Sequence, residues 1–253
     1  MWLLLLALVV KSSPTGVLEV EADGIRGRLF IGVHGPNWSF NSQPNAWMSV
    51  SAKEGVLREG ERTEARGAIP LPQGCRGELR FVERLRAGRD EVEVDYTLEF
   101  TKDTPVWRLG IDFSVPIRIL EGKRALILGP DAEFIFPERG GKGFGGSAFG
   151  LAIPLDKRRA FVIVADVPTP MSIEDARNWG GNSYEIRFNL IRRGRGLSGL
   201  PLRRVLRLAI VPKGREGEMV RAMKVDRTKP FATALDDGGV CLLYTSPSPR
   251  DRG

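Results

Sequence analysis

The chain has little of the chemistry that metal and nucleophilic sites require. Its 253 residues include one histidine, His34, and two cysteines, Cys75 and Cys241. One histidine does not complete the common zinc ligand sets, and no other residue signposts a Ser-His-Asp arrangement. The sequence therefore predicts no metal site and no cofactor, and it leaves any catalytic residue unknown. Gly35 and Pro36 follow His34 directly, which predicts a turn at this position.

The chain also lacks a nucleotide-binding loop. The glycine-rich residues 140–147 miss the GxxxxGK[ST] spacing and precede a strand-like run, so we expect a flexible loop there. Residues 187–215 hold nine basic and no acidic residues, which favours an anionic partner such as a lipid headgroup or an acidic polysaccharide. No recognition helix or aromatic platform accompanies them, so we expect no nucleic-acid partner. The alternative is a solvated strand face, on which Arg203 and Arg207 pair with the carboxylates of residues 90–99.

No apolar run is long enough to cross a membrane as a helix, so no membrane span is expected. The longest run, residues 1–10, suits the hydrophobic part of a secretion signal. Residues 1–16 are therefore a possible signal segment, and we expect export to the periplasm, the cell surface or the exterior. No basic residue precedes the run and no clear cleavage site follows it, so a buried first strand is the alternative.

Residues 241–251 resemble a translated sequencing adapter. Their codons can be written without mismatch as the end sequence used in transposon-based library preparation. On this interpretation residues 241–253 are a non-native tail, and the natural chain continues beyond residue 240 into a missing C-terminal domain. Cys241 then forms no disulfide, and Cys75 is expected to be a packed small residue rather than a reactive thiol.

Short strands dominate the rest of the chain. Thirty glycines and 17 prolines interrupt runs in which apolar and polar residues alternate with a period of two. The clearest alternating runs are residues 91–100, 107–115, 184–190 and 203–211. Residues 161–164 are apolar on both faces and predict a central strand. The fold class expected is all-β: a large antiparallel two-sheet β-sandwich over residues 17–212, with at most one short helix, near residues 215–224. Residues 213–240 are expected to be a linker or the start of a truncated second domain.

Tryptophans beside polar residues are the best candidates for a binding site. Sugar sites combine an aromatic face, which stacks on C–H groups, with side chains that bind hydroxyls. The alternation of residues 107–115 predicts that Trp107 faces the core, and carboxylates are too numerous for a glycosidase pair to be singled out. The candidate ligand-binding residues are Trp38, Trp47, Asp175, Arg177 and Trp179.

One segment carries a family resemblance. Residues 171–181 and the strand at 184–190 resemble the end of the galactose-mutarotase-like β-supersandwich modules that precede catalytic domains in bacterial glycoside hydrolases. Residues 96–100 and 104–107 fit the same pattern. The resemblance implies a carbohydrate context for residues 17–212, and it transfers no catalytic residue. Mutarotase-like enzymes use a histidine and a carboxylate, so a single histidine in a turn weighs against that activity.

Three functions are consistent with these patterns. The first is a non-catalytic module of a larger exported carbohydrate-active protein, truncated before its catalytic domain. The second is an enzyme, such as an isomerase or a lyase, whose site lies on one sandwich face. The third is a structural module of the cell surface. A concave face lined by tryptophan, arginine and carboxylates would favour a site on the sandwich itself, whereas a flat, filled face would favour a scaffold.

Overall fold

The computed structural model describes residues 8–46, 54–138, 143–223, 231–232 and 242–243. Trp47 lies outside these ranges, as do most of the adapter-like tail and the start of the expected signal segment. Every ladder between named strands in the described ranges is antiparallel. The all-β antiparallel prediction is therefore confirmed.

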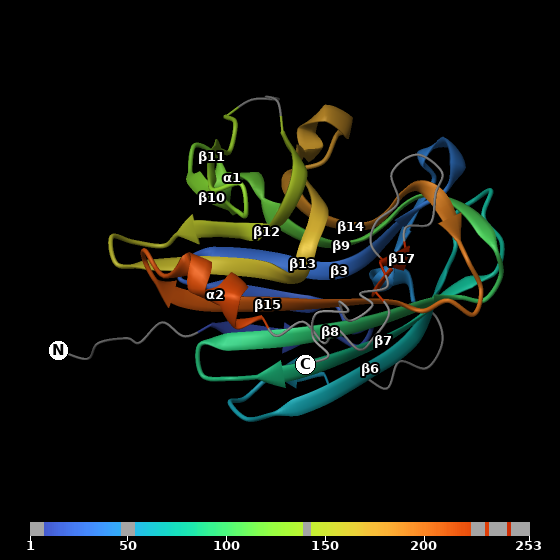
Figure 1. Ribbon diagram of the computed structural model, residues 1–253, viewed down its shortest axis with the longest axis horizontal. Coiled ribbons are helices and arrows are strands. Elements are labelled where there is room, and N and C mark those ends of the chain that lie inside the picture. The colour runs from blue at the N-terminus through green and yellow to red at the C-terminus, as the bar shows by residue number, and fades with distance from the viewer. Residues whose placement is uncertain (1–7, 47–53, 139–142, 224–230, 233–241, 244–253) are drawn as a thin grey trace, which may run out of the picture.

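The strands form two layers; in Figure 1, β3, β9 and β14 of one layer lie above β15, β8, β7 and β6 of the other. The lower one, here called the β8 layer, contains in spatial order β6 (Arg62–Pro70), β7 (Glu78–Ala87), β8 (Glu91–Phe100), β15 (Leu202–Pro212) and the first half of β13 (Arg159–Asp175). The other, here called the β9 layer, contains β5 (Gly55–Val56), β1 (Val9–Ser12), β2 (Leu18–Ala22), β3 (Ile25–His34), β9 (Thr104–Pro116), β14 (Ser183–Gly196) and the second half of β13.

Strand β13 connects the two layers because it changes partner along its length. Its residues 159–165 pair with β15, and its residues 171–175 pair with β14. Strand β12 (Phe144–Pro154) follows the other edge of β13 through the bend, where the register shifts between Ala148 and Gly150. A side chain at Gly150 would place its Cβ 1.9 Å from the Ile163 carbonyl oxygen, so only glycine fits this close approach. The predicted sandwich is thus one continuous sheet that curls over itself.

The core lies between the two layers. One face of each layer is apolar, as the alternation in the sequence predicts, and the Phe113 ring of β9 lies 5.8 Å from the Phe161 ring of β13 across the interior. In β8, all five residues of the predicted apolar face, Val92, Val94, Tyr96, Leu98 and Phe100, are buried. Burial of side chains of this size stabilises the fold by about 1.5–3 kcal/mol each.

The outer face of the β8 layer is partly covered by helix α2 (Glu216–Ala222), which confirms the predicted short helix. Met219 and Met223 bury Val162 and Val164 of β13 on the side opposite the main core. Strand β13 is therefore apolar on both faces here, as predicted for a central strand. Farther along the same face, Arg203 pairs with Asp95 and Arg207 pairs with Glu93, both at 2.7 Å, which confirms the predicted ion pairs.

The remaining elements are short. They are α1 (Ile117–Leu120), β4 (Phe40–Ser42), β10 (Arg124–Leu128), β11 (Ala132–Ile135), β16 (Phe231–Ala232), β17 (Leu242–Leu243) and the 3-10 turns η1 (Pro36–Trp38), η2 (Gln43–Asn45) and η3 (Ala176–Trp179). None of the helices in the described ranges has the length and apolarity to span a bilayer.

Two segments differ from the sequence-based expectations. Strand β12 begins at Phe144, inside the stretch expected to be a flexible loop, because its glycines pair with the second half of β13. Strand β1 lies within residues 1–16 and pairs with β2, and its Val10 is buried in the core. This arrangement corresponds to the alternative of a buried first strand, and export stays a prediction.

Candidate functional site

The outer face of the β9 layer is polar and hollowed. Two cavities lie on it, here called the aromatic cavity, of about 550 Å³, and the arginine cavity, of about 360 Å³. The aromatic cavity is lined by Phe30, His34, Trp38, Phe40, Asp112, Glu174, Trp179, Glu185 and Arg187. The arginine cavity is lined by Trp38, Trp107, Arg108, Ser172, Glu174, Arg187, Asn189, Arg192 and Arg193. Three residues belong to both, so the cavities are neighbours.

A buried ion pair forms part of the floor. Arg108 and Asp112 lie on one face of β9 with Gly110 between them. The guanidinium of Arg108 extends along the strand and donates to both carboxylate oxygens of Asp112. Arg108 also donates to Asn189 Oδ1 on β14 at 2.6 Å. A Cβ at Gly110 would lie 2.7 Å from Arg108, and one at the paired Gly32 of β3 would lie 2.5 Å from Asp112. The two glycines therefore give the ion pair room to lie flat on the sheet.

A second ion pair separates the two cavities. Arg187 of β14 donates to Glu174 of β13 at 2.6 Å, and its guanidinium lies 5.4 Å from the centre of the Trp179 ring. Glu185 accepts hydrogen bonds from Ser114 and Ser183, at 2.8 and 2.6 Å. These bonds hold both carboxylates in place at the cavity wall.

His34 lies at the end of β3 rather than in a turn, so the turn prediction was wrong: η1 begins two residues later. The imidazole packs against Phe40 at 4.6 Å and Trp38 at 5.7 Å between ring centres. Burial, with the nearby charges of Arg108 and Arg187, lowers the pKa of His34 to about 4, so it is neutral at pH 7. Its Nδ1 is buried and has no hydrogen-bond partner among the described residues.

Aromatic rings surround the polar floor. Trp38, Phe40 and Trp179 are 56%, 51% and 54% exposed, and they account for three of the six large hydrophobic residues exposed in the described ranges. Trp107 meets Trp38 edge-on at 5.4 Å and lines the arginine cavity, so its predicted core position was wrong. The regular alternation fails here because Val106 and Leu109, three positions apart, both enter the core.

The structure brings together two of the five predicted site residues. Trp38 and Trp179 line the aromatic cavity, although they lie far apart in the sequence. Asp175 and Arg177 form a bidentate pair, at 2.9 and 2.6 Å, that lines neither cavity. Arg177 instead donates to the Pro137 carbonyl oxygen at 2.9 Å, which joins η3 to the loop after β11. Trp47 is outside the described residues.

Sequence reasoning missed most of the polar floor. Arg108, Asp112 and Arg187 fall on the polar positions of alternating strands, where solvent-exposed charges are the ordinary outcome. The available signal was a pair of glycines in strand interiors, Gly32 and Gly110, because interior glycine marks a close approach. Cys75 is half-buried with its thiol directed at the Pro105 carbonyl oxygen, and burial raises its pKa, which disfavours a reactive thiolate.

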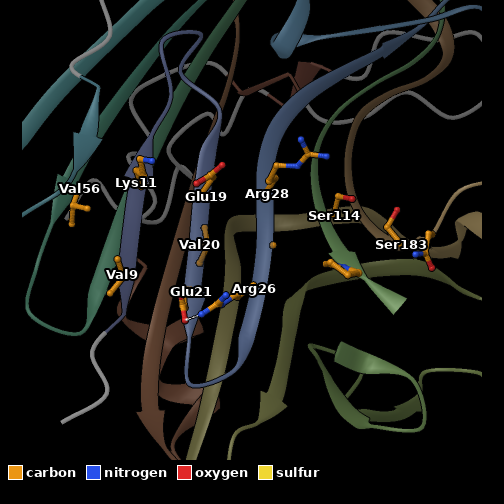
Figure 2. A pocket seen from close by; sticks show the side chains of 13 residues that line it. Val9, Lys11, Glu19, Val20, Glu21, Arg26, Arg28, Val56, Ser114 and Ser183 are labelled. Carbon is orange, nitrogen blue, oxygen red and sulfur yellow. Dashed lines mark hydrogen bonds and ion pairs between the residues drawn. The ribbon is translucent and has the colours of Figure 1, made fainter. Parts of the chain in front are cut away.

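A third cavity, of about 580 Å³, lies toward the β1 edge of the same face (Figure 2). Charged side chains of both signs line it on adjacent strands, and Arg26 pairs with Glu21 at 2.7 Å. It contains no aromatic side chain. This composition is that of a solvated strand face, so the aromatic and arginine cavities form the better candidate site. Within the described ranges, no group of three or more His, Cys, Asp or Glu residues could hold a metal ion.

Comparison with known proteins identifies no family for this chain. No protein-family model matches it, and no curated protein matches it. Among solved structures, a protein from Escherichia coli K12 provisionally described as an aldose 1-epimerase is similar, with a TM-score of 0.44 and 9% sequence identity. The match covers 81% of this chain and 99% of the other. Similarity at this level carries no functional information, so function is argued from the site alone.

Proposed function

We propose that the protein binds a saccharide on the outer face of the β9 layer, in the aromatic cavity. The observation that carries this proposal is the group of exposed rings, Trp38, Phe40 and Trp179, around a floor of hydrogen-bonding side chains. A cluster of exposed apolar side chains rimmed by polar residues is typical of a ligand-binding surface. A sugar ring presents C–H groups to such rings and hydroxyls to carboxylates and guanidinium groups.

The polar groups of the cavity suit binding of a neutral hydroxyl-rich ligand. Glu174 accepts one hydrogen bond on each oxygen, from Ser172 and Arg187, and Glu185 accepts two on one oxygen. Ionised carboxylates carry about four acceptor sites, so both can still accept bonds from hydroxyl donors. Because Glu174 and Glu185 are already held by Arg187 and serines, little side-chain conformational freedom is lost when the ligand binds. The hollowed face is also the feature expected of a sandwich that carries its own site, rather than of a scaffold with a flat, filled face.

We favour a role in binding over a role in catalysis. The position of His34 at the cavity supports a catalytic alternative. Its neutral imidazole and unpartnered Nδ1 lie at the cavity that also holds Glu174 and Glu185, which is the composition required for proton transfer on a sugar. A pKa of about 4 makes His34 a weak base, and only about one molecule in a thousand is protonated at pH 7. We therefore place sugar isomerisation second.

The proposal also includes export of the protein and a place for the sandwich in a larger carbohydrate-active protein. The proposal of export rests on the apolar composition of residues 1–10, of which Val9 and Val10 belong to β1 in the fold. The family resemblance of residues 171–181 supports a place in a larger carbohydrate-active protein. Reading the gene beyond codon 240 tests the second point. A catalytic domain downstream of the sandwich is the expected result, and a stop codon within a few codons of natural sequence would contradict it.

The binding proposal is tested with the purified protein on an array of oligosaccharides, followed by calorimetric titration of the strongest ligand. Trp38→Ala and Trp179→Ala should each weaken binding about tenfold, because each removes a stacking surface. Ile135→Ala is the matched control, since Ile135 is equally exposed but lies on β11 and lines neither cavity. Unchanged affinity in both tryptophan variants, or no binding to any oligosaccharide, would contradict the proposal.

The catalytic alternative needs a separate measurement. Proton NMR follows the interconversion of sugar anomers with and without the protein. Binding without acceleration is the result expected here. Acceleration that His34→Asn abolishes, while oligosaccharide affinity is retained, would make isomerisation the leading function.

A further inference from the structure

The arginine cavity differs from the aromatic cavity in its charge. It is lined by Arg108, Arg187, Arg192 and Arg193, against a single lining carboxylate, Glu174. Asp112 neutralises Arg108 from below the surface, and Glu174 neutralises Arg187. Arg193 is exposed and adds positive charge at the open side of the cavity. The cavity therefore has a surplus of positive charge among its lining residues, which favours an anionic ligand.

Backbone irregularities in β14 direct the side chains of Arg192 and Arg193 to the same cavity. In a regular strand, consecutive side chains point to opposite faces, yet Arg192 and Arg193 both line one cavity. The ladder with β9 shifts between Asn189 and Ile191, and Arg193 adopts a left-handed φ of 47°. Bulges of this kind redirect side chains beside functional sites.

The conformation of Arg193 is costly for a residue with a side chain. Left-handed backbone at a residue other than glycine stores strain, and such residues cluster at ligand sites. An arginine at the strained position is explained if its guanidinium has a task in the cavity.

Arg187, which lines the cavity, also has an unsatisfied donor. The Nε of Arg187 is buried and has no hydrogen-bond partner among the described residues, although the same guanidinium donates to Glu174. An arginine with one side engaged can still present donors in a fixed plane, which matches carboxylate and sulfate oxygens.

We propose that the arginine cavity binds an acidic substituent, the carboxylate of a uronic acid or a sulfate ester, on a saccharide that also occupies the aromatic cavity. This inference rests on the proposed saccharide binding. Trp38, Glu174 and Arg187 line both cavities, so one ligand can contact both. The aromatic cavity contributes stacking, and the arginine cavity selects for charge.

The test uses an array with neutral, uronate-containing and sulfated oligosaccharides of matched backbone. We expect acidic members to bind at least about tenfold more tightly than their neutral counterparts at low salt, and this preference to shrink as salt rises. The uronate and sulfate arms distinguish the two sources of charge. Equal binding of neutral and acidic members would overturn this inference and leave the proposed function standing, whereas no binding at all would overturn both.

Arg193→Gln tests the residue that carries the argument. It should reduce the affinity for acidic oligosaccharides about tenfold and leave the affinity for neutral ones unchanged. Arg195→Gln is the matched control, because Arg195 is exposed on the same strand and lines neither cavity. Equal losses in the two variants would show a general charge effect and would contradict a built acidic subsite.

Discussion

The two outer faces of the sandwich carry the same kinds of residue and use them differently. On the β8 layer, arginine and carboxylate side chains pair across neighbouring strands at the surface, as Arg203 does with Asp95. On the β9 layer, the side chains of Arg108 and Asp112 are only 6% and 2% exposed. Surface pairs contribute little to stability, whereas a buried pair is costly to break. The comparison indicates that buried charge and exposed aromatic rings, rather than charge alone, distinguish the face on which we propose the saccharide site.

The largest loss of stability should come from removing one partner of the buried ion pair formed by Arg108 and Asp112. Asp112→Ala leaves the Arg108 guanidinium buried beside only Asn189, so the free energy of unfolding should fall by about 3–5 kcal/mol. Glu133→Ala, which breaks the exposed pair with Arg124, should cost about 0.5 kcal/mol or less. Urea denaturation of both variants checks the contrast, and equal losses would contradict it.

Glu83 is a buried acid without a cationic partner, and it can be contrasted with Asp112, which is buried beside Arg108. Glu83 lies on the core face of β7, accepts one hydrogen bond from Gln43 at 2.7 Å, and burial raises its pKa to about 8. The folded state then holds a proton that the unfolded state releases near pH 4.5. Stability contributed by the neutral acid is therefore full below about pH 4.5 and is lost as the pH rises through about 8.

Denaturation as a function of pH tests Glu83. His34, with its lowered pKa, adds stability as the pH rises to about 6.5 and offsets the Glu83 loss up to that point. Wild-type stability should therefore fall between about pH 6.5 and 8, and Glu83→Gln should remove most of this slope because glutamine does not titrate. Glu133→Gln, an exposed acid, should leave the slope in place. A variant slope equal to that of the wild type would show that Glu83 is not protonated in the fold.

A smaller loss of stability is expected from adding a side chain at Gly110, where the ion pair packs closely against the sheet. Gly110→Ala places a Cβ 2.7 Å from both Arg108 and the Phe188 carbonyl oxygen, which should cost about 1–3 kcal/mol by overpacking. Gly145→Ala on β12 is the matched control, because no atom lies within 4 Å of the Cβ that it would add. Thermal denaturation distinguishes the two, and comparable melting temperatures would contradict the close packing of the ion pair on the sheet.

Much of the fold was predictable because its layers follow period-two alternation. Residues 91–100 show a strictly alternating pattern, and the structure buries the predicted face. The curling of one sheet was not predictable, since the partner change of β13 depends on pairing between distant strands. The position of Trp107 was mispredicted because the alternation of β9 fails between Val106 and Leu109, which both enter the core.

The site was predictable only in part. Loop tryptophans with polar neighbours identified Trp38 and Trp179, whose shared cavity depends on the register of β3, β9 and β14. The same argument selected Asp175 and Arg177, but these two pair with each other, and Arg177 donates to the Pro137 carbonyl oxygen. Spacing along the chain gives residue types but not the direction of their side chains, and it gave no signal that Arg187 would contact Trp179.

The central claim is that the outer face of the β9 layer is a saccharide site. A crystal structure of the protein with the strongest oligosaccharide from the array tests it most directly. We predict a sugar ring against Trp38 or Trp179, with hydroxyls bound by Glu174 or Arg187. A ligand seated on the β8 layer, or at the β1 edge away from these rings, would contradict the account.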